Sequence, residues 1–506
     1  MANQEKSPLR TAALLAALLF AVYNANLRAV HTDDSIPTRL LPFALLVDHT
    51  FYLDRWVAPY LPGLHGPYGI YFVLPYEGHW LSAYPLINPL VITPAYLLPA
   101  RWLSRLDPQP QPGDIVLTAL IDVMEKLSAS FMAAISAAIL FLALRRVVKP
   151  AAAVMVSLIY ALAGSTWSIS SQALWKHGFE EVCFAGLLWT LLADDGRLRY
   201  AVGIGLAAGA AANNTPPYAL VALLLAPYFM RNSKRLAAYS SPVALLGIAA
   251  LAYNHHFSGH FLGMYPNPVH PPNTALYRRM RSSFGDALMG LAISPNRGLL
   301  IYSPWVLVAL WGAWLAWCER RYAWERWLMV AAAFIYLGYA EFSAWWGGLC
   351  YGPRYLVDLL PFIAYFLARA WGRVERSRLL QAGLAAAVVV SIWVQAVGAF
   401  NFPRGRWDMT PRSVNYFPGR LWDWRDTQIS RTWAAGPAQP EMLYQLFILL
   451  GANQASSEAR KSAGILSTTS AEARPRPPGK LPHRPADPAA DIGSGSHVRL
   501  QARAGP

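Results

Sequence analysis

Long apolar segments recur through the first 400 residues of this chain of 506 residues. A helix of about 17 to 25 apolar residues crosses a hydrocarbon core of roughly 30 Å, so each segment is a candidate membrane span. Hydrophobic residues make up 55% of the chain and charged residues only 14%, which is too apolar for soluble domains. The segments are 11–30, 119–144, 151–167, 179–193, 200–212, 218–230, 242–254, 299–317, 327–342, 355–368 and 379–400. We therefore predict an all-α membrane protein with a bundle of about 11 transmembrane helices.

Lysine and arginine cluster between every second pair of these segments. Short cytoplasmic loops keep basic residues, so the alternation predicts that the N-terminus, residues 1–10, is cytoplasmic. The clusters are Lys6 and Arg10; Arg145, Arg146 and Lys149; Arg197 and Arg199; Arg231, Lys234 and Arg235; Arg320, Arg321 and Arg326; and Arg369, Arg373, Arg376 and Arg378. The first loop on the outer face, residues 31–118, is then the largest. The formal net charge of +15 is interpreted as this topology signal, and we expect no nucleic-acid partner.

The two ends of the chain differ in character from the bundle. The first apolar segment lacks a small-residue cleavage pattern, so we expect an uncleaved helix. Residues 401–451 follow the last predicted span and are expected to be extracytoplasmic. Residues 452–506 contain no aromatic residue and are rich in Pro, Ala, Ser and Arg, so we predict a disordered tail that cannot bury a core.

The first outside loop carries the most informative polar residues. It opens with HTDDSIPTR at 31–39, continues to GHWLSAYP at 78–85, and ends in the amphipathic stretch LINPLVITPAYLLPARWL at 86–103. A pair of acidic residues next to the end of a helix is either a solvated turn or helix cap, or part of a catalytic site. The residues alone leave both interpretations open.

Three later stretches follow this acidic loop in a particular order. They are SPNRGLLIYSP at 294–304, WWGG at 345–348 followed by YGPRYL at 351–356, and RLWDWRD at 420–426. With the first helix, the Asp-bearing loop and the long bundle, the chain over residues 11–431 resembles the GT-C superfamily of polyprenyl-phosphate-dependent glycosyltransferases. It is similar to bacterial members related to protein O-mannosyltransferases and lipid A aminoarabinose transferases. The resemblance implies a GT-C-like bundle in a bacterial inner (plasma) membrane.

The same resemblance implies a reaction. A hexosyl or pentosyl group would move from a polyprenyl-phosphate sugar donor to a lipid, glycan or protein acceptor at the extracytoplasmic face, in contact with membrane lipid. In the family an acidic residue of the first loop is the candidate general base that deprotonates the acceptor. That position matches Asp34, with Asp33 as the second candidate. Two adjacent side chains do not easily point the same way, so only one of them is expected to face the reacting atoms.

A phosphate leaving group calls for fixed cations. We predict phosphate contacts from four residues: Arg354, Arg297, Lys126 and Arg39. Arg354 and Arg297 lie in Gly/Pro-punctuated stretches on the outer side, where the topology rule disfavours arginine. Structural pairing with Asp358, Asp286 or backbone carbonyls is the alternative for these two. Lys126 could instead pair with Glu125 or extend toward the interface.

Aromatic and histidine side chains near these stretches suit sugar or isoprenoid contact. The predicted acceptor or sugar pocket comprises Tyr84, His79, His177, Trp345, Trp346 and Tyr351. His177 shares a helical face with Glu180 and could instead fix the start of its helix. The histidines at 255, 256 and 260 form a weak ligand set, and the three cysteines have no metal-ligand spacing, so we expect no metal and no cofactor.

Two other classes of membrane protein remain open from the sequence. A transporter or flippase for a lipid-linked glycan has a similar helix count, but no internal repeat is visible here. A polymerase or ligase of surface polysaccharide also uses external arginines, although its large outer loop normally lies late in the chain. The acidic first loop of roughly 90 residues favours an enzyme.

Overall fold

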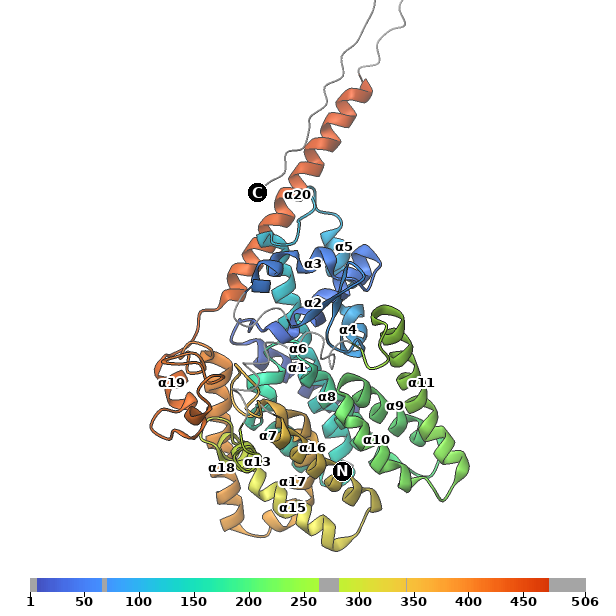
Figure 1. Ribbon diagram of the computed structural model, residues 1–506, viewed down its shortest axis with the longest axis vertical. Helices are drawn as coiled ribbons and strands as arrows, with labels where there is room; N and C mark the ends of the chain where they lie inside the picture. The colour runs from blue at the N-terminus through green and yellow to red at the C-terminus, as the bar shows by residue number, and fades with distance from the viewer. Residues whose placement is uncertain (1–6, 66–70, 264–281, 343, 473–506) are drawn as a thin grey trace, which may run out of the picture. The chain divides into compact units, whose positions relative to one another are not determined.

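The protein is almost entirely α-helical (Figure 1). The computed structural model describes residues 7–65, 71–263, 282–342 and 344–472. The chain divides into a unit of residues 1–455 and a second unit of residues 456–506. The longer helices of the first unit are α1 (Pro8–Asn24), α6 (Ile115–Leu144), α7 (Pro150–Ala163), α8 (Lys176–Ala193), α9 (Leu198–Asn214), α11 (Ser233–Ser258), α13 (Phe284–Ile293), α15 (Val306–Glu319), α16 (Ala323–Glu341), α17 (Leu360–Val374) and α18 (Arg378–Asn401).

Each of the eleven apolar segments lies largely in a helix or in a pair of short helices. Proline divides two of them: the segment 299–317 splits into α14 (Leu299–Tyr302) and α15 at Pro304, and the helix α10 (Ala219–Leu225) ends before Pro227. Among the described residues, three helices are long and apolar enough to cross a membrane by length and composition: α6, α11 and α18. The predicted helical architecture is therefore confirmed, whereas the count of about 11 spans is not.

Close helix packing depends on glycine at particular points. A Cβ atom on Gly312 of α15 would lie 1.8 Å from the carbonyl oxygen of Phe366 on α17. A Cβ atom on Gly205 of α9 would lie 2.0 Å from the carbonyl oxygen of Tyr239 on α11. Small residues let helix backbones approach in this way where lipid replaces water as the solvent.

The first loop folds into a compact layer of short elements. They are η1 (Asp33–Ser35), α2 (Ile36–Phe43), η2 (Ala44–Asp48), α3 (Asp54–Val57), η3 (Ala58–His65), the strands β1 (Val73–Tyr76) and β2 (His79–Ser82), α4 (Ile87–Ile92), η4 (Thr93–Tyr96) and α5 (Leu97–Leu103). The two strands form an antiparallel hairpin, in which Val73 pairs with Ser82 and Tyr76 with His79. The loop is thus a folded part of the first unit that positions its polar side chains.

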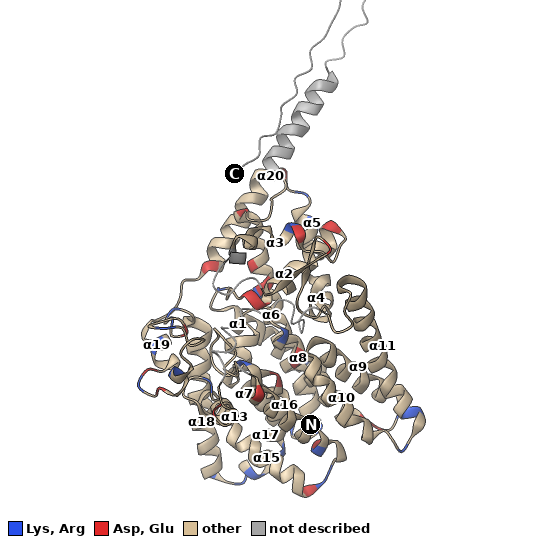
Figure 2. Ribbon diagram, viewed as in Figure 1, with Lys and Arg blue, Asp and Glu red and all other residues tan. Residues whose placement is uncertain are grey.

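The two ends of the bundle carry different elements. The turns between α15 and α16 and between α17 and α18 lie at one end, and the first-loop elements lie at the other (Figure 1). Most of the ribbon along α9, α11 and α18 carries no charged residue, and basic residues mark the turns (Figure 2). The orientation in a membrane stays a prediction.

The chain after α18 first forms an irregular segment with η9 (Pro418–Trp422) and α19 (Gln428–Ala434). The last helix, α20 (Glu441–Glu472), follows it. The predicted boundary of the tail at residue 452 falls inside α20, and residues 473–506 lie outside the described part of the chain.

Candidate active site at the first loop

The acidic pair lies in a single turn between two helices. Asp33 and Asp34 form η1 together with Ser35, and Pro37 in the first turn of α2 starts the next helix with its fixed φ. Ser35 donates a hydrogen bond from its hydroxyl to the carbonyl oxygen of Thr32 at 3.0 Å, which closes the turn. Asp33 is exposed, and Asp34 is partly buried. The two carboxylates therefore meet different surroundings.

Asp34 is the acceptor at the centre of a polar cluster. Its Oδ1 accepts hydrogen bonds from the hydroxyls of Tyr84 at 2.7 Å and Tyr71 at 3.0 Å. Its Oδ2 forms an ion pair with Arg354, 320 positions away along the chain. Burial raises the pKa of the Asp34 carboxyl, but the Arg354 charge and these hydrogen bonds outweigh it and hold the pKa below its usual value. Asp34 is thus a stable carboxylate.

Arg354 begins η8 (Arg354–Leu359), directly after Gly352 and Pro353. Its guanidinium lies 5.1 Å from the centroid of the Trp175 ring, and the side chain is 14% exposed. The Nε–H of Arg354 has no acceptor among the described residues. Aromatic stacking orients the guanidinium plane, and a free N–H remains for an oxyanion.

A second cation lies in the same charged neighbourhood. Lys176 is the first residue of α8, directly after Trp175, and its side chain is half-buried. The charges that act on it are those of Asp358, Arg354, Glu180 and Asp34. Lys176 was not among the site residues predicted from the sequence. Its place one residue before His177 is the signal that could have identified it.

Asp33 points to the other side of the turn. It lines a cavity of about 430 Å³ with Arg39, Tyr60 and Asp122 among its walls. No hydrogen bond or ion pair of its carboxylate is found in the described part of the chain. Partial shielding from water and the neighbouring Asp34 charge raise the pKa of Asp33, although Arg39 lowers it. The two carboxylates therefore face different surroundings, and which of them faces the reacting atoms stays a prediction.

The predicted phosphate ligands Arg39 and Lys126 are both buried inside the protein. The Nη1 atom of Arg39 donates to Glu125 at 2.6 Å and to Asp122 at 3.1 Å. Lys126 donates to the carbonyl oxygen of Ser171 at 3.0 Å and to Oε1 of Gln172 at 2.8 Å. Lys126 therefore does not pair with Glu125, which is the partner of Arg39. Both cations have protein partners and lie apart from the contacts of Asp34.

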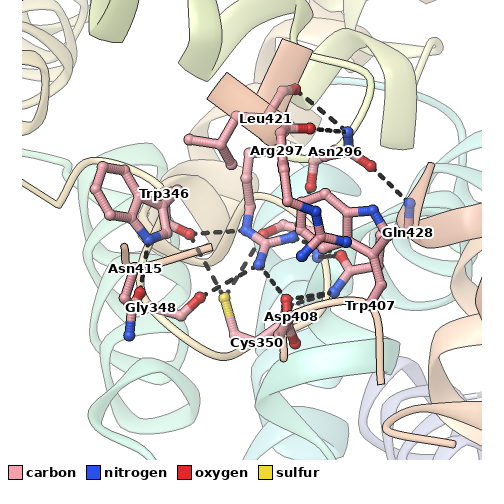
Figure 3. A network of polar contacts seen from close by, with 12 residues as sticks. Asn296, Arg297, Trp346, Gly348, Cys350, Trp407, Asp408, Asn415, Leu421 and Gln428 are labelled. Atoms are coloured by element: carbon pink, nitrogen blue, oxygen red, sulfur yellow. Dashed lines mark hydrogen bonds and ion pairs between the residues drawn. The ribbon is translucent and has the colours of Figure 1, made fainter. Parts of the chain in front are cut away.

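Arg297 has acceptors for all five of its N–H groups (Figure 3). Nε donates to the carbonyl oxygen of Trp346, Nη1 to Asn296 and Gln428, and Nη2 to Gly348 and Asp408. The side chain is 1% exposed. No donor is left for a phosphate oxygen, so the geometry favours the structural alternative for Arg297. Its partners are backbone carbonyls, Gln428 and Asp408 and do not include Asp286 or Asp358.

The predicted sugar pocket is not brought together as one group. Only Tyr84 contacts Asp34. His79 lies on the exposed hairpin, with Nδ1 2.7 Å from Asp54. His177 is buried, with Nδ1 2.7 Å from Asp358, which also accepts from Tyr218 at 2.6 Å.

Three aromatic members of the predicted pocket belong to the core. Trp345, Trp346 and Tyr351 are each 1% exposed. The Trp346 Nε1–H donates to Asn415 at 2.9 Å, and the Tyr351 hydroxyl donates to the carbonyl oxygen of Val394 at 2.9 Å. Their fully buried rings favour packing over sugar contact, because no face of these rings is open to a ligand. Three further arginines of the predicted outer loop that contains Arg297, namely Arg278, Arg279 and Arg281, lie outside the described residues.

No model of a known protein family matches the chain, and neither does any curated protein. Among solved structures, the chain is similar to ArnT from Cupriavidus metallidurans bound to undecaprenyl phosphate, with 14% identity over 92% of this chain and 81% of that chain and a TM-score of 0.47. It is also similar to the apo oligosaccharyltransferase of Archaeoglobus fulgidus, with 12% identity over 86% of this chain and 61% of that chain and a TM-score of 0.45.

A further match is the archaeal oligosaccharyltransferase AglB from Archaeoglobus fulgidus in complex with an inhibitory peptide and a dolichol-phosphate. The identity is 12%, the match covers 86% of this chain and 61% of that chain, and the TM-score is 0.41.

Proposed function

We propose that this protein is a membrane glycosyltransferase that moves a sugar from a polyprenyl-phosphate donor to an acceptor at the extracytoplasmic face of a bacterial inner membrane. One observation carries the proposal. The first-loop carboxylate Asp34 pairs with Arg354 of the YGPRYL stretch, so two motifs of the family resemblance meet in space. A carboxylate, an arginine with an unused N–H and a neighbouring lysine supply the charges that phosphate departure requires.

The donor phosphate is assigned to Arg354 and Lys176. A guanidinium forms forked hydrogen bonds with phosphate oxygens, and an ammonium adds a second positive charge. In the absence of donor, Asp34 neutralises Arg354. The Nε–H of Arg354 is buried without an acceptor among the described residues, so a phosphate oxygen would bind it after the side chains around it move, without breaking that pair.

The general base is assigned to Asp33. Its raised pKa makes it more basic than Asp34, and it has no protein partner to displace among the described residues. The acceptor oxygen or nitrogen attacks the anomeric carbon and transfers its proton to the Asp33 carboxylate. The bond between the anomeric carbon and the phosphate oxygen breaks, and its electron pair leaves with the polyprenyl phosphate. This assignment reverses the order of preference that the sequence favoured.

A flippase for a lipid-linked glycan is the second candidate. Four titratable side chains, His177, Glu180, Glu181 and Asp358, are completely buried in and beside α8. Such groups in a bundle interior are typical of transport or proton pathways. A flippase moves the intact donor across the membrane and releases no lipid phosphate, so one assay separates the two functions.

The test uses protein purified in detergent with a panel of radiolabelled polyprenyl-phosphate sugars and acceptor lipids, glycans and peptides. We expect release of lipid phosphate and labelled product. Asp33→Asn should lower turnover by about 100-fold to 10,000-fold, the usual cost of removing a general base. Asp107→Asn is the matched control, because Asp107 is an exposed aspartate of the same loop.

Two results would count against parts of this proposal. If Asp34→Asn stops turnover while Asp33→Asn keeps it, the base is Asp34. If no donor in the panel is cleaved while reconstituted protein moves the intact donor between leaflets, the protein is a flippase.

A further inference from the structure

The cavity beside Asp33 is built from three separate parts of the chain. The acidic turn and α2 supply Asp33 and Arg39, the short helices α3 and η3 supply Trp56 and Tyr60, and α6 supplies Asp122. Its volume of about 430 Å³ lies in the range of small-molecule sites. The cavity is separate from the cluster of Asp34 and Arg354, because neither of those residues lines it.

The polar groups of the cavity offer both kinds of hydrogen-bonding partner. Asp33 presents an exposed carboxylate with no partner in the described part of the chain. Arg39 is 5% exposed, and its Nε–H has no acceptor among the described residues. An unsatisfied buried donor is costly, and a ligand oxygen would satisfy this one after the side chains around the Nε atom move. An acceptor and a donor at one cavity suit a ligand that carries hydroxyl groups.

The walls between these polar groups include the aromatic residues Trp56 and Tyr60. The Nε1–H of Trp56 donates to Asp48 at 2.6 Å, and the Tyr60 hydroxyl accepts from Arg39 at 3.1 Å, so both rings are held in place. Trp56 is 1% exposed, so the partly buried Tyr60 ring is the aromatic group that presents an apolar surface beside the charged hydrogen-bonding groups. The ring carbons and hydroxyls of a sugar match this combination.

Charge excludes the other ligands that the proposed reaction involves. Asp33 and Asp122 are both carboxylates of the cavity, and the Arg39 charge is already paired with Asp122 and Glu125. A phosphate would meet two carboxylates, and the basic groups of the cavity, Arg39 and His31, already lie against Asp122. An isoprenoid chain would have to desolvate these carboxylates.

We propose that this cavity is a saccharide-binding subsite, and that the acceptor of the reaction is a hydroxyl of a sugar held there. The second half of this inference rests on the proposed function. The donor phosphate lies on the side of Asp34 and the acceptor saccharide on the side of Asp33, so the acceptor hydroxyl meets the anomeric carbon at the edge of η1. The protein therefore extends or decorates a glycan or a glycolipid, and a peptide is not its acceptor.

The test measures saturation transfer from the purified protein to methyl glycosides of glucose, mannose, galactose and glucosamine by NMR. Thr118→Phe places a large side chain in the cavity, because Thr118 is an exposed residue of its wall. Ile115→Phe is the matched control, since Ile115 is exposed on the same helix and does not line the cavity. We expect binding to be lost in Thr118→Phe, kept in Ile115→Phe and weakened about tenfold in Asp33→Asn.

The outcomes separate this inference from the proposed function. Binding of a glycoside that is equal in wild type, Thr118→Phe and Asp33→Asn, or no binding of any glycoside, would overturn the saccharide subsite. Turnover with an acceptor that carries no sugar, unchanged in Thr118→Phe, would overturn the acceptor assignment and leave the glycosyltransferase standing. Glycoside binding without cleavage of any donor would leave the subsite standing and remove the proposed reaction.

Discussion

Two arginines that look equivalent in the sequence occupy opposite situations in the structure. Arg297 is 1% exposed and donates all of its N–H groups to protein acceptors. Arg354 is 14% exposed, forms an ion pair with Asp34, and keeps an Nε–H without an acceptor in the described residues. A saturated guanidinium holds a fold together, whereas an incompletely coordinated one is available to a ligand.

The two sites are nevertheless connected by one short loop. Trp346 and Gly348 give their carbonyl oxygens to Arg297, and Gly352 directly precedes the turn that carries Arg354. Gly348 and Gly352 have φ values of +72° and +70°, which residues with a Cβ rarely adopt. The Arg297 cluster therefore supports the loop that presents Arg354.

The largest expected effect is on stability, and it comes from Arg297→Ala. The change leaves Asp408 buried without its ionic partner and the carbonyl oxygens of Trp346 and Gly348 without their donor. Breaking a buried ion pair on one side costs about 3–5 kcal/mol. We expect low yield and a clear drop in melting temperature, measured by differential scanning fluorimetry in detergent.

The matched control for this variant is Arg425→Ala, because Arg425 is an exposed arginine of the same C-terminal segment. Its melting temperature should equal that of the wild type. A well-folded Arg297→Ala protein that fails only to use the lipid-phosphate donor would contradict the structural role of Arg297. Arg297 would then be assigned to phosphate binding.

The next effect is a pH dependence at Asp408. Burial raises the pKa of Asp408 to about 6 from its ordinary 3.8, although Arg297 lowers it. Because the folded state holds the proton more tightly, this group favours folding below about pH 4, and the contribution is lost as the pH rises through 6. The shift corresponds to about 3 kcal/mol of unfolding free energy.

Asp408→Asn isolates this contribution, since asparagine keeps an oxygen that accepts from Arg297 and Gln428. The melting temperature of the variant minus that of the wild type should increase from pH 4 to 6 and stay constant above. A difference that does not change with pH would show that Asp408 is ionised throughout. Because the other carboxylates titrate in both proteins, their effect cancels in the difference between the two melting temperatures.

A smaller effect is expected from Arg354, and it concerns donor use. Losing hydrogen bonds between charged partners costs about 10-fold to 100-fold in affinity, so Arg354→Ala should raise the KM for the polyprenyl-phosphate donor by this factor. Arg354→Lys keeps the positive charge but cannot form the forked pair of hydrogen bonds. Its donor KM should lie between those of the wild type and Arg354→Ala. The KM for the acceptor should not change. If both KM values stay at wild-type levels in folded Arg354→Ala, the arginine serves only to hold Asp34.

The helices were predictable because their signal is local. Runs of apolar residues and the basic clusters that follow them can be identified within about 20 residues of sequence. The number of membrane spans was harder to predict, because a proline such as Pro304 divides an apolar segment into two helices without making it less apolar. The folded first loop was also missed, since its short helices and its hairpin depend on contacts with the bundle.

The sequence identified several residues of the candidate site, but it did not show which of them contact one another. Asp34, Tyr84 and Arg354 were each named from their motifs, and they meet. The partner of Arg354 was not identified: the sequence offered Asp358, four residues away, as a structural partner, whereas the ion pair joins Arg354 to Asp34, 320 residues away. Separation along the chain conceals a contact of this kind, and Tyr71 was missed for the same reason.

The smallest effect, close to none, is expected from Lys126→Met. Lys126 is buried without an ion-pair partner among the described residues, and its two acceptors each have another donor. The carbonyl oxygen of Ser171 also accepts from Ser130 at 3.1 Å, and Oε1 of Gln172 accepts from Asn26 at 2.7 Å. Removing the charge therefore leaves neither acceptor unsatisfied, and a methionine of similar length fills the space without a buried charge.

We expect the donor KM of Lys126→Met to equal that of the wild type and the melting temperature to be equal or higher. Both values are measured on one preparation beside Arg354→Ala, which serves as the positive control for donor loss. A higher donor KM with an unchanged melting temperature would mean that Lys126 reaches the phosphate in the donor-bound state. The rule that a cation with satisfied protein partners is structural would then fail for this protein, and the assignment of Arg297 would have to be tested again by the same pair of measurements.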